Sequence, residues 1–233
     1  MSTLTLYLGP LEPCPYLDER ISQMAFLAPD AVVTPHLYSV LVAHGFRRSG
    51  SLIYRPQCPN CNACEPVRIP VNQFKPSRTQ RRSEKHYDDV IVVERPAIFN
   101  ADHYDLYRRY QMARHPEGNM GQAGPQEYID FLANDRFEGT VFLEFIHGDH
   151  LLGVAVVDEL EQGFSAVYTF FDPDDSAGSP GTFAILWEIK ELIRRGKPWL
   201  YLGFWIEASP KMRYKSRFRP LERRSEWGWI PVE

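Results

Sequence analysis

The sequence contains no run of about 18 apolar residues, the length that a membrane-spanning helix requires. Residues 1–7 also lack a basic segment leading into an apolar core, so we expect no secretion signal, no membrane partner and a cytoplasmic protein. No internal repeat and no low-complexity tract is present, which argues against a repeat architecture. The 233 residues are 44% hydrophobic, enough for one large domain or two small ones.

Cysteine is scarce, but its four copies are not scattered. Cys58, Cys61 and Cys64 follow one another at x2 spacing, and Cys14 lies near the start of the chain. Because cysteines stay reduced in the cytoplasm, such a cluster indicates metal ligands rather than disulfides. The spacing matches the opening of a bacterial ferredoxin motif without its next cysteine, and thiolates also suit tetrahedral zinc. We therefore predict a [4Fe-4S] cluster or zinc here, with free thiols as a third interpretation.

The net charge is −4, yet the basic residues are concentrated in two segments. Residues 75–85 and 211–224 hold 12 of the 26 lysines and arginines and only 2 of the 30 acidic residues. An acidic body with two basic segments indicates a local site for a polyanion. The alternative is that both segments are ordinary solvated surface.

Local signals predict a succession of short elements. Thr34 and Pro35 predict a helix start, and Gly45 its end. We expect short strands near residues 3–8, 46–54, 67–71 and 89–94. From residue 100 we expect two helices, strands over 140–146, 151–157 and 164–171, a long helix over 182–195 and a strand over 199–206. Ser179, just before Pro180, is the expected N-cap of the long helix.

The order of elements after residue 100 is that of acyltransferases of the GNAT type. We therefore expect an α/β (α+β) fold, with a GNAT-like transferase domain at 97–233 and an N-terminal region at 1–96 that carries the cysteine-ligated site. Pro96 marks the expected boundary. In a GNAT fold the reactive end of the donor lies between two splayed central strands, near the start of the next helix. That places the donor near residues 168–172 and 176–181.

Several motifs resemble those of the aminoacyl-tRNA–protein transferases. In the N-terminal half they are the cysteine triplet and residues 45–50 (GFRRSG), 54–56 (YRP), 66–71 (PVRIPV) and 80–82 (QRR). In the C-terminal half they are residues 165–173 (SAVYTFFDP), 201–207 (YLGFWIE) and 211–215 (KMRYK). The likeness covers nearly the whole chain, whose compact length resembles the bacterial branch. One departure is at residues 178–181, which read GSPG where the family usually has RSLG.

The resemblance implies transfer of leucine from leucyl-tRNA to proteins that begin with Asp or Glu, which marks them for degradation. Eukaryotic relatives carry arginine, so arginyl-tRNA is the alternative donor. The resemblance also implies a cluster or metal on the four cysteines. The expected partners are thus an aminoacyl-tRNA and a protein with an acidic N-terminal residue.

The chemistry of that reaction suggests roles for individual residues. An α-amine with a pKa of about 7.7–8.0 attacks an activated ester, so Tyr168 and Asp172 are candidates to accept its proton. An acidic acceptor needs a cation, and the candidates, which would equally suit tRNA phosphate, are Arg68, Lys211, Arg213 and Lys215. To the tRNA backbone we assign Arg78, Arg81, Arg82 and Lys85. We expect the donor cleft to include Ser179 and Gly181.

Two other classes of protein share part of this pattern. A CoA-dependent acetyltransferase would need a glycine-rich pyrophosphate loop at the start of the long helix, where Asp174 and Asp175 are unfavourable. A metal-stabilised RNA-binding module would explain the cysteines and the basic segments but not the second half of the chain.

Overall fold

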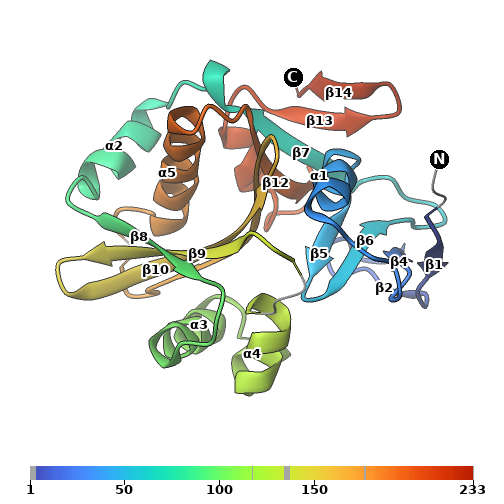
Figure 1. Ribbon diagram of the computed structural model, residues 1–233, viewed down its shortest axis with the longest axis horizontal. Coiled ribbons are helices and arrows are strands. Elements are labelled where there is room, and N and C mark those ends of the chain that lie inside the picture. The colour runs from blue at the N-terminus through green and yellow to red at the C-terminus, as the bar shows by residue number, and fades with distance from the viewer. Residues whose placement is uncertain (1–3, 117, 134–136, 176, 233) are drawn as a thin grey trace.

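The computed structural model describes residues 4–116, 118–133, 137–175 and 177–232. An eight-stranded sheet runs through the middle of the molecule (Figure 1). Helices α2 (Arg78–His86) and α5 (Pro180–Arg194) lie on one side, and α3 (Ala101–Arg114) and α4 (Pro125–Leu132) on the other. Within the described residues, no helix is both long and apolar enough to cross a membrane.

The strand order of the large sheet is β14-β13-β7-β12-β11-β10-β9-β8. Its strands are β7 (Glu65–Pro70), β8 (Ile91–Pro96), β9 (Thr140–His147), β10 (His150–Leu160), β11 (Gly163–Phe171), β12 (Trp199–Trp205), β13 (Glu222–Ser225) and β14 (Gly228–Pro231). Neighbouring strands are antiparallel except β11 and β12, which are parallel. A parallel pair needs a crossover connection, which α5 supplies.

The N-terminal residues form a smaller unit beside this sheet. Its four-stranded sheet has the order β1 (Leu6–Leu8), β4 (Met24–Leu27), β6 (Leu52–Pro56) and β5 (Arg47–Ser49). A two-stranded sheet pairs β2 (Glu12–Pro13) with β3 (Ile21–Ser22), and the helix is α1 (Pro35–Ala43). Three 3₁₀ turns complete the chain: η1 (Val71–Gln73), η2 (Asn119–Gln122) and η3 (Arg213–Arg217).

A buried polar network joins the small unit to β10. Asp158 accepts hydrogen bonds from Arg48 Nε at 2.7 Å and Nη2 at 2.8 Å, and from the Tyr38 hydroxyl at 2.6 Å. Thr140 Oγ1 donates to the same carboxylate at 2.8 Å. The side chains of Arg48 and Asp158 are only 1% and 2% exposed, so each charge depends on the other for its solvation.

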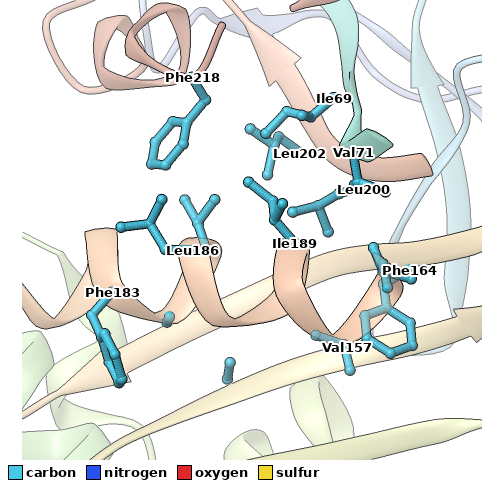
Figure 2. Packing of buried hydrophobic residues seen from close by; sticks show 14 of the residues in the cluster. Ile69, Val71, Val157, Phe164, Phe183, Leu186, Ile189, Leu200, Leu202 and Phe218 are labelled. Carbon is cyan, nitrogen blue, oxygen red and sulfur yellow. The ribbon is translucent and has the colours of Figure 1, made fainter. Parts of the chain in front are cut away.

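The core lies mainly between α5 and the large sheet. Leu186 and Ile189 extend from α5 toward side chains of β7, β12 and the C-terminal segment, whereas Phe183 packs against Phe145 of β9 (Figure 2). Those partners include Ile69, Leu200, Leu202 and Phe218. Each such side chain contributes about 1.5–3 kcal/mol when it is fully buried. The helix and the strand that the sequence predicts over residues 182–195 and 199–206 therefore pack against each other in this core.

Most expected elements are present. Thr34 Oγ1 accepts the Leu37 amide at the start of α1, and Asn100 caps α3 through the amides of Asp102 and His103. Helix α5 begins at Pro180, directly after Ser179, as expected. The Ser179 side chain, however, makes no capping hydrogen bond, and its backbone has φ 60°.

Helix α2 was not expected from the sequence. It covers most of the first basic segment and starts with a capping box, in which Ser77 and Gln80 bond each other's backbone amides. The capping box was a local signal for this helix.

The expected boundary at residue 96 falls within the large sheet. Strand β7 is paired on both sides, by β12 and β13, and β8 pairs with β9 along its whole length. Strands β7 and β8 therefore belong to the same sheet as the C-terminal half, whereas the last strand of the four-stranded sheet in chain order, β6, ends at Pro56.

Candidate active site

The two central parallel strands separate after three residue pairs. β11 and β12 pair at Gly163–Trp199, Phe164–Leu200 and Ser165–Tyr201, and no further pairs join them. Where they part, both strands are irregular, because the β10–β11 register skips Val167 and the β12–β7 register skips Leu202. We call this opening the fork. The splayed central strands expected from the sequence are thus present.

Arg47, from β5 of the small sheet, lies in the fork. Its Nη2 donates to the Ala166 carbonyl at 2.6 Å, and its Nη1 donates to Ser165 Oγ at 3.2 Å. A Cβ at Gly203 of β12 would lie 2.8 Å from the guanidinium carbon, and Gly203 has φ +76°. The guanidinium therefore occupies the space between the two strands and pairs with backbone oxygen that β12 no longer approaches.

Lys215, in η3, is buried next to this opening. Its Nζ donates to the Phe204 carbonyl of β12 at 2.5 Å. Burial, followed by the charge of Arg47, lowers the pKa of Lys215 to about 7, against an opposing effect of Cys64. Lys215, a candidate for the acceptor carboxylate or tRNA phosphate, is thus buried and bonded to the backbone in this structure.

Tyr168 lies half-buried on β11, beyond the point where the strands part. Its hydroxyl accepts a hydrogen bond from Gln111 Nε2 at 2.7 Å. Burial raises the pKa of Tyr168, as does the nearby Tyr110, so the hydroxyl stays protonated at neutral pH. Since its oxygen accepts from Gln111, its own proton remains available for another acceptor.

Asp172, at the end of β11, is held by the side chains of Arg109 and His150. Its carboxylate lies 2.6 Å from Arg109 Nη2 and 2.8 Å from His150 Nε2. Burial alone would raise the pKa of Asp172, but the bonds from Arg109, the Asp174 amide and His150 lower it overall. A carboxylate paired in this way is a weak proton acceptor at neutral pH.

The start of α5 is packed against α2. Ser83 Oγ donates to the Gly178 carbonyl at 2.5 Å, and a Cβ at Gly178 would lie 2.2 Å from the His86 ring. A side chain at 178 would therefore require the rings of His86 and Tyr87 to move. Gly181 approaches Phe171 of β11, since its Cβ would lie 3.0 Å from that ring. The two residues expected in the donor cleft, Ser179 and Gly181, thus lie between α2 and the end of β11.

The four tRNA candidates of the first basic segment form one exposed stripe. They occur on α2 at positions i, i+3, i+4 and i+7, which share a helix face, and they are Arg78, Arg81, Arg82 and Lys85. None of them pairs with a carboxylate of the described residues, whereas Glu84 on the same helix pairs with Lys190 at 2.8 Å.

The remaining cationic candidates are in different surroundings. Arg68 lies between two indole rings, 3.4 Å from Trp199 and 4.4 Å from Trp229, and its Nε bonds Glu222 at 2.7 Å. Arg68, a candidate for binding substrate, thus links β7 to β13 in this structure. Lys211 and Arg213 are exposed, and the charge of Lys211 helps to lower the pKa of His115.

The cysteines come from two separate segments. Cys14 follows β2, and its amide bonds the Arg20 carbonyl at 2.9 Å, while the other three lie in the loop between β6 and β7. All four thiols are free and half-buried. Burial, then the charges of Cys58, Cys14 and Cys61, raise the pKa of Cys64 to about 12, which indicates that the four are neighbours.

These thiols suit zinc or an iron–sulfur cluster in their chemistry. In the part of the chain that the structure describes, however, no three His, Cys, Asp or Glu side chains already converge in the manner of metal ligands.

Sequence reasoning missed two ionisable residues, the half-buried Arg47 in the fork and Glu188 in α5. Arg47 was noted only as part of the 45–50 motif. Glu188 of α5 is fully buried, and neither carboxylate oxygen has a partner. Burial raises the pKa of Glu188 to about 8. The one available signal for Glu188 was an acidic residue within the apolar spacing of the long helix.

Comparisons with known families agree with this architecture. Residues 102–225 match the family described as arginine-tRNA-protein transferase, C terminus, and residues 12–82 match its N terminus. The chain belongs to the arginine-tRNA-protein transferase family. The two matched segments of this transferase leave out the end of α2 and all of β8, and they include both the fork and the cysteines.

Curated relatives of this transferase carry a more specific name. An aspartate/glutamate leucyltransferase from Nitrosococcus oceani is 48% identical over 96% of this chain and 94% of that protein. Another, from Teredinibacter turnerae, is 43% identical over 100% of this chain and 96% of that protein. A solved structure of L-PGS from Bacillus licheniformis has a TM-score of 0.46 and 9% identity, covering 62% of this chain and 47% of that one. An overlap this weak does not establish a shared fold or function.

Proposed function

We propose that this protein moves leucine from leucyl-tRNA to the N-terminal Asp or Glu of other proteins. The observation that carries the proposal is the fork, where two central parallel strands separate in front of a long helix, as a GNAT-like acyltransferase core requires. Leucine as the donor is supported by the names of the relatives. The new N-terminal leucine would mark the product for degradation.

The reaction itself needs positioning more than activation. The acceptor's α-amine nitrogen attacks the carbonyl carbon of the aminoacyl ester, a C–N bond forms, and the C–O bond to the tRNA ribose breaks. The amine loses a proton and the ribose oxygen gains one. Because an α-amine has a pKa of about 7.7–8.0, part of it is neutral without a strong base. Holding amine and ester together can supply about 7–11 kcal/mol of the acceleration.

Arg47 is suited to the charge that develops in this step. The ester oxygen becomes negative as the carbon becomes tetrahedral, and a fixed cation stabilises it without reorganisation. Arg47 is held by Ser165 Oγ and the Ala166 carbonyl at the fork, so its position does not depend on substrate.

Tyr168 and Asp172 take different roles from each other. The protonated Tyr168 hydroxyl can donate its hydrogen to the leaving ribose oxygen, and recover a proton from the amine through solvent. Asp172 acts through Arg109 and His150, which it holds at the end of β11, and is therefore a positioning residue.

The tRNA is proposed to lie across α2 and the start of α5. The basic stripe of α2 would contact phosphates, and the segment at Ser179 and Gly181 would receive the acceptor end beside the fork. Lys211 and Arg213, exposed in the second basic segment, can add phosphate contacts. Because charged tRNA is made and used in the cytoplasm, we propose that the protein works there.

We further propose that the four cysteines hold an iron–sulfur cluster or zinc. Cys14, Cys58, Cys61 and Cys64 would be its ligands, and such a group would link the N-terminal strands to the loop before β7. The group would stabilise that loop when it is bound, and a cluster would also make the loop sensitive to oxidation.

The direct test measures transfer of labelled leucine and labelled arginine from their tRNAs to peptides. The peptides begin with Asp, Glu, Arg or Ala and are otherwise identical. We expect leucine to be transferred to the Asp and Glu peptides only. Transfer of arginine instead, which the family's name supports as the second candidate, would change the donor but keep the reaction. No transfer from either tRNA would refute the proposed function.

A further inference from the structure

A second opening lies on the small-sheet side of the molecule, beside the proposed cysteine site. It is a cleft of about 460 Å³ between the end of α1, the cysteine loop, β12 and the β13–β14 turn. Its lining includes Arg55, Gln57, Phe204 and Glu226, together with two of the proposed metal ligands, Cys58 and Cys64. Pockets of about 300–1,000 Å³ hold small ligands in other proteins, and this volume suits one or two amino-acid residues.

The cleft and the basic stripe of α2 lie on opposite faces of the large sheet. Phe204 faces the small sheet, with its ring 6.1 Å from that of Tyr54. The apolar residues Val67 and Leu202 face α5, on the side where α2 packs. A ligand in the cleft and a tRNA on α2 would therefore approach the fork from opposite sides, as two reactants must.

The cleft reaches almost to the fork. A smaller cavity of about 10 Å³ shares Gly45 and Pro66 with the cleft, and its other walls include Arg47 and Gly203. Gly45 has φ +88°, and a Cβ there would lie 2.8 Å from Pro66 Cγ, so this thin wall requires glycine. The inner end of the cleft thus adjoins the cavity that Arg47 and Gly203 line.

Arg55 is the cation that this cleft offers. It is half-buried, with its guanidinium carbon 5.1 Å from the centre of the Phe46 ring. Unlike Arg68, it has no carboxylate partner among the described residues. Stacking on an aromatic ring fixes the plane of a guanidinium and leaves its edge free for the two oxygens of a carboxylate.

We propose that this cleft binds the first residue of the acceptor polypeptide, with Arg55 paired to the side-chain carboxylate of Asp or Glu. The proposal rests on the function proposed above and gives its acceptor site. The first residue of such an acceptor carries a side-chain carboxylate, which suits Arg55, and an α-amine, which must stay free to reach the ester at the fork.

The test compares Arg55→Met with Arg108→Met in the full-length protein. Arg108 is a matched control, because it is an exposed arginine whose guanidinium stacks 5.9 Å from the Tyr104 ring, away from the cleft. Two quantities are measured: kcat and KM for leucyl transfer to an Asp-initiated peptide, and the Kd of the same fluorescent peptide without tRNA. We expect Arg55→Met to raise the acceptor KM and Kd about 10- to 100-fold, since a hydrogen-bonded charge pair is lost. The KM for leucyl-tRNA and all values for Arg108→Met should stay within about twofold.

Two further variants make the result specific. Arg55→Glu should shift binding from Asp-initiated to Lys-initiated peptides, which a purely structural role of Arg55 would not do. Arg55→Lys keeps the charge and the fold and should weaken Asp-peptide binding about 3- to 10-fold, because it loses the two-point contact.

Each outcome separates this proposal from the proposed function. Unchanged acceptor KM and Kd in Arg55→Met, or in Arg55→Lys should Arg55→Met not fold, would overturn the cleft while leaving the transferase in place. Arg55-dependent binding of acidic peptides, without transfer from any tRNA, would support the cleft and refute the transfer.

Discussion

Arg47 Nη2 lies 2.6 Å from the carbonyl oxygen of Ala166, in the gap where β12 no longer pairs with β11. A side chain of the small N-terminal sheet thus completes the hydrogen bonding of a strand in the large sheet. The opening that a donor would use is shaped by both halves of the chain. This contact explains how an N-terminal region with its own sheet can influence chemistry at the centre of the protein.

Replacing Arg47 should impair catalysis more than binding. Arg47→Met removes a fixed cation from the fork, and we expect kcat for leucyl transfer to fall about 10²- to 10³-fold. Arg47→Lys keeps a charge and should recover part of that loss. The KM for both substrates should change little, as measured by steady-state kinetics. A kcat for Arg47→Met within threefold of the wild type would contradict a role at the reacting carbonyl.

Breaking the Arg48–Asp158 pair should destabilise the fold. Because both side chains are almost completely buried, Arg48→Met leaves an unpaired charge and should cost about 3–5 kcal/mol in urea unfolding. The control is Lys190→Met, which breaks the solvent-exposed pair with Glu84 and should cost less than about 1 kcal/mol. Equal effects of the two substitutions would show that the buried network does not hold the two sheets together.

Glu188 should make the stability of the protein depend on pH. Its pKa is raised by burial from 4.5 to about 8, so the unfolded chain releases this proton at lower pH than the folded one. The unfolding free energy of the wild type should therefore fall relative to Glu188→Gln as pH rises from 4.5 to 8, by at most about 1.4 kcal/mol per pH unit. Parallel pH profiles of the two proteins would mean that Glu188 is ionised in the fold.

The basic stripe of α2 should show itself in the salt dependence of tRNA binding. Arg82→Gln removes one expected phosphate contact and should lower the slope of log Kd against log salt by about 0.7–0.9. The acceptor KM should not change. Arg108→Gln, on the other side of the sheet, serves as the control and should leave the slope as it is. A slope unaffected by Arg82→Gln would remove this helix face from the tRNA site.

The cysteine site can be tested through metal content. The Cys61→Ser protein should contain no iron or zinc after anaerobic purification. The control is Ala63→Ser, which also introduces a serine into this loop and should keep the metal. Elemental analysis measures both metals, and an absorption band near ~400 nm identifies a cluster. Stoichiometric zinc without that band would decide for zinc, and an unchanged content in Cys61→Ser would exclude Cys61 as a ligand.

Local signals predicted much of this structure. Thr34 before Pro35 and Asn100 before its helix are caps whose side chains bond the first free amides, and these depend only on neighbours in sequence. The apolar spacing of residues 182–195 predicted a helix buried on one face, and the continuous apolar run at 199–206 predicted a strand buried on both faces. Both predictions are possible because each kind of burial requires apolar residues at characteristic positions. The motifs at residues 45–50, 58–64 and 165–173 indicated the family, because each can be recognised in a short stretch of sequence.

Tertiary structure alone decided which charges are free to bind a substrate. Lys211, Arg213 and Lys215 look alike in sequence, yet Lys215 is buried against the Phe204 carbonyl while the other two are exposed. Likewise Arg47 enters the fork and Arg55 lines the cleft. The physical reason is that burial and pairing depend on strands distant in sequence, such as β7 inserted between β12 and β13, and a charged residue carries no local mark of which partner will reach it.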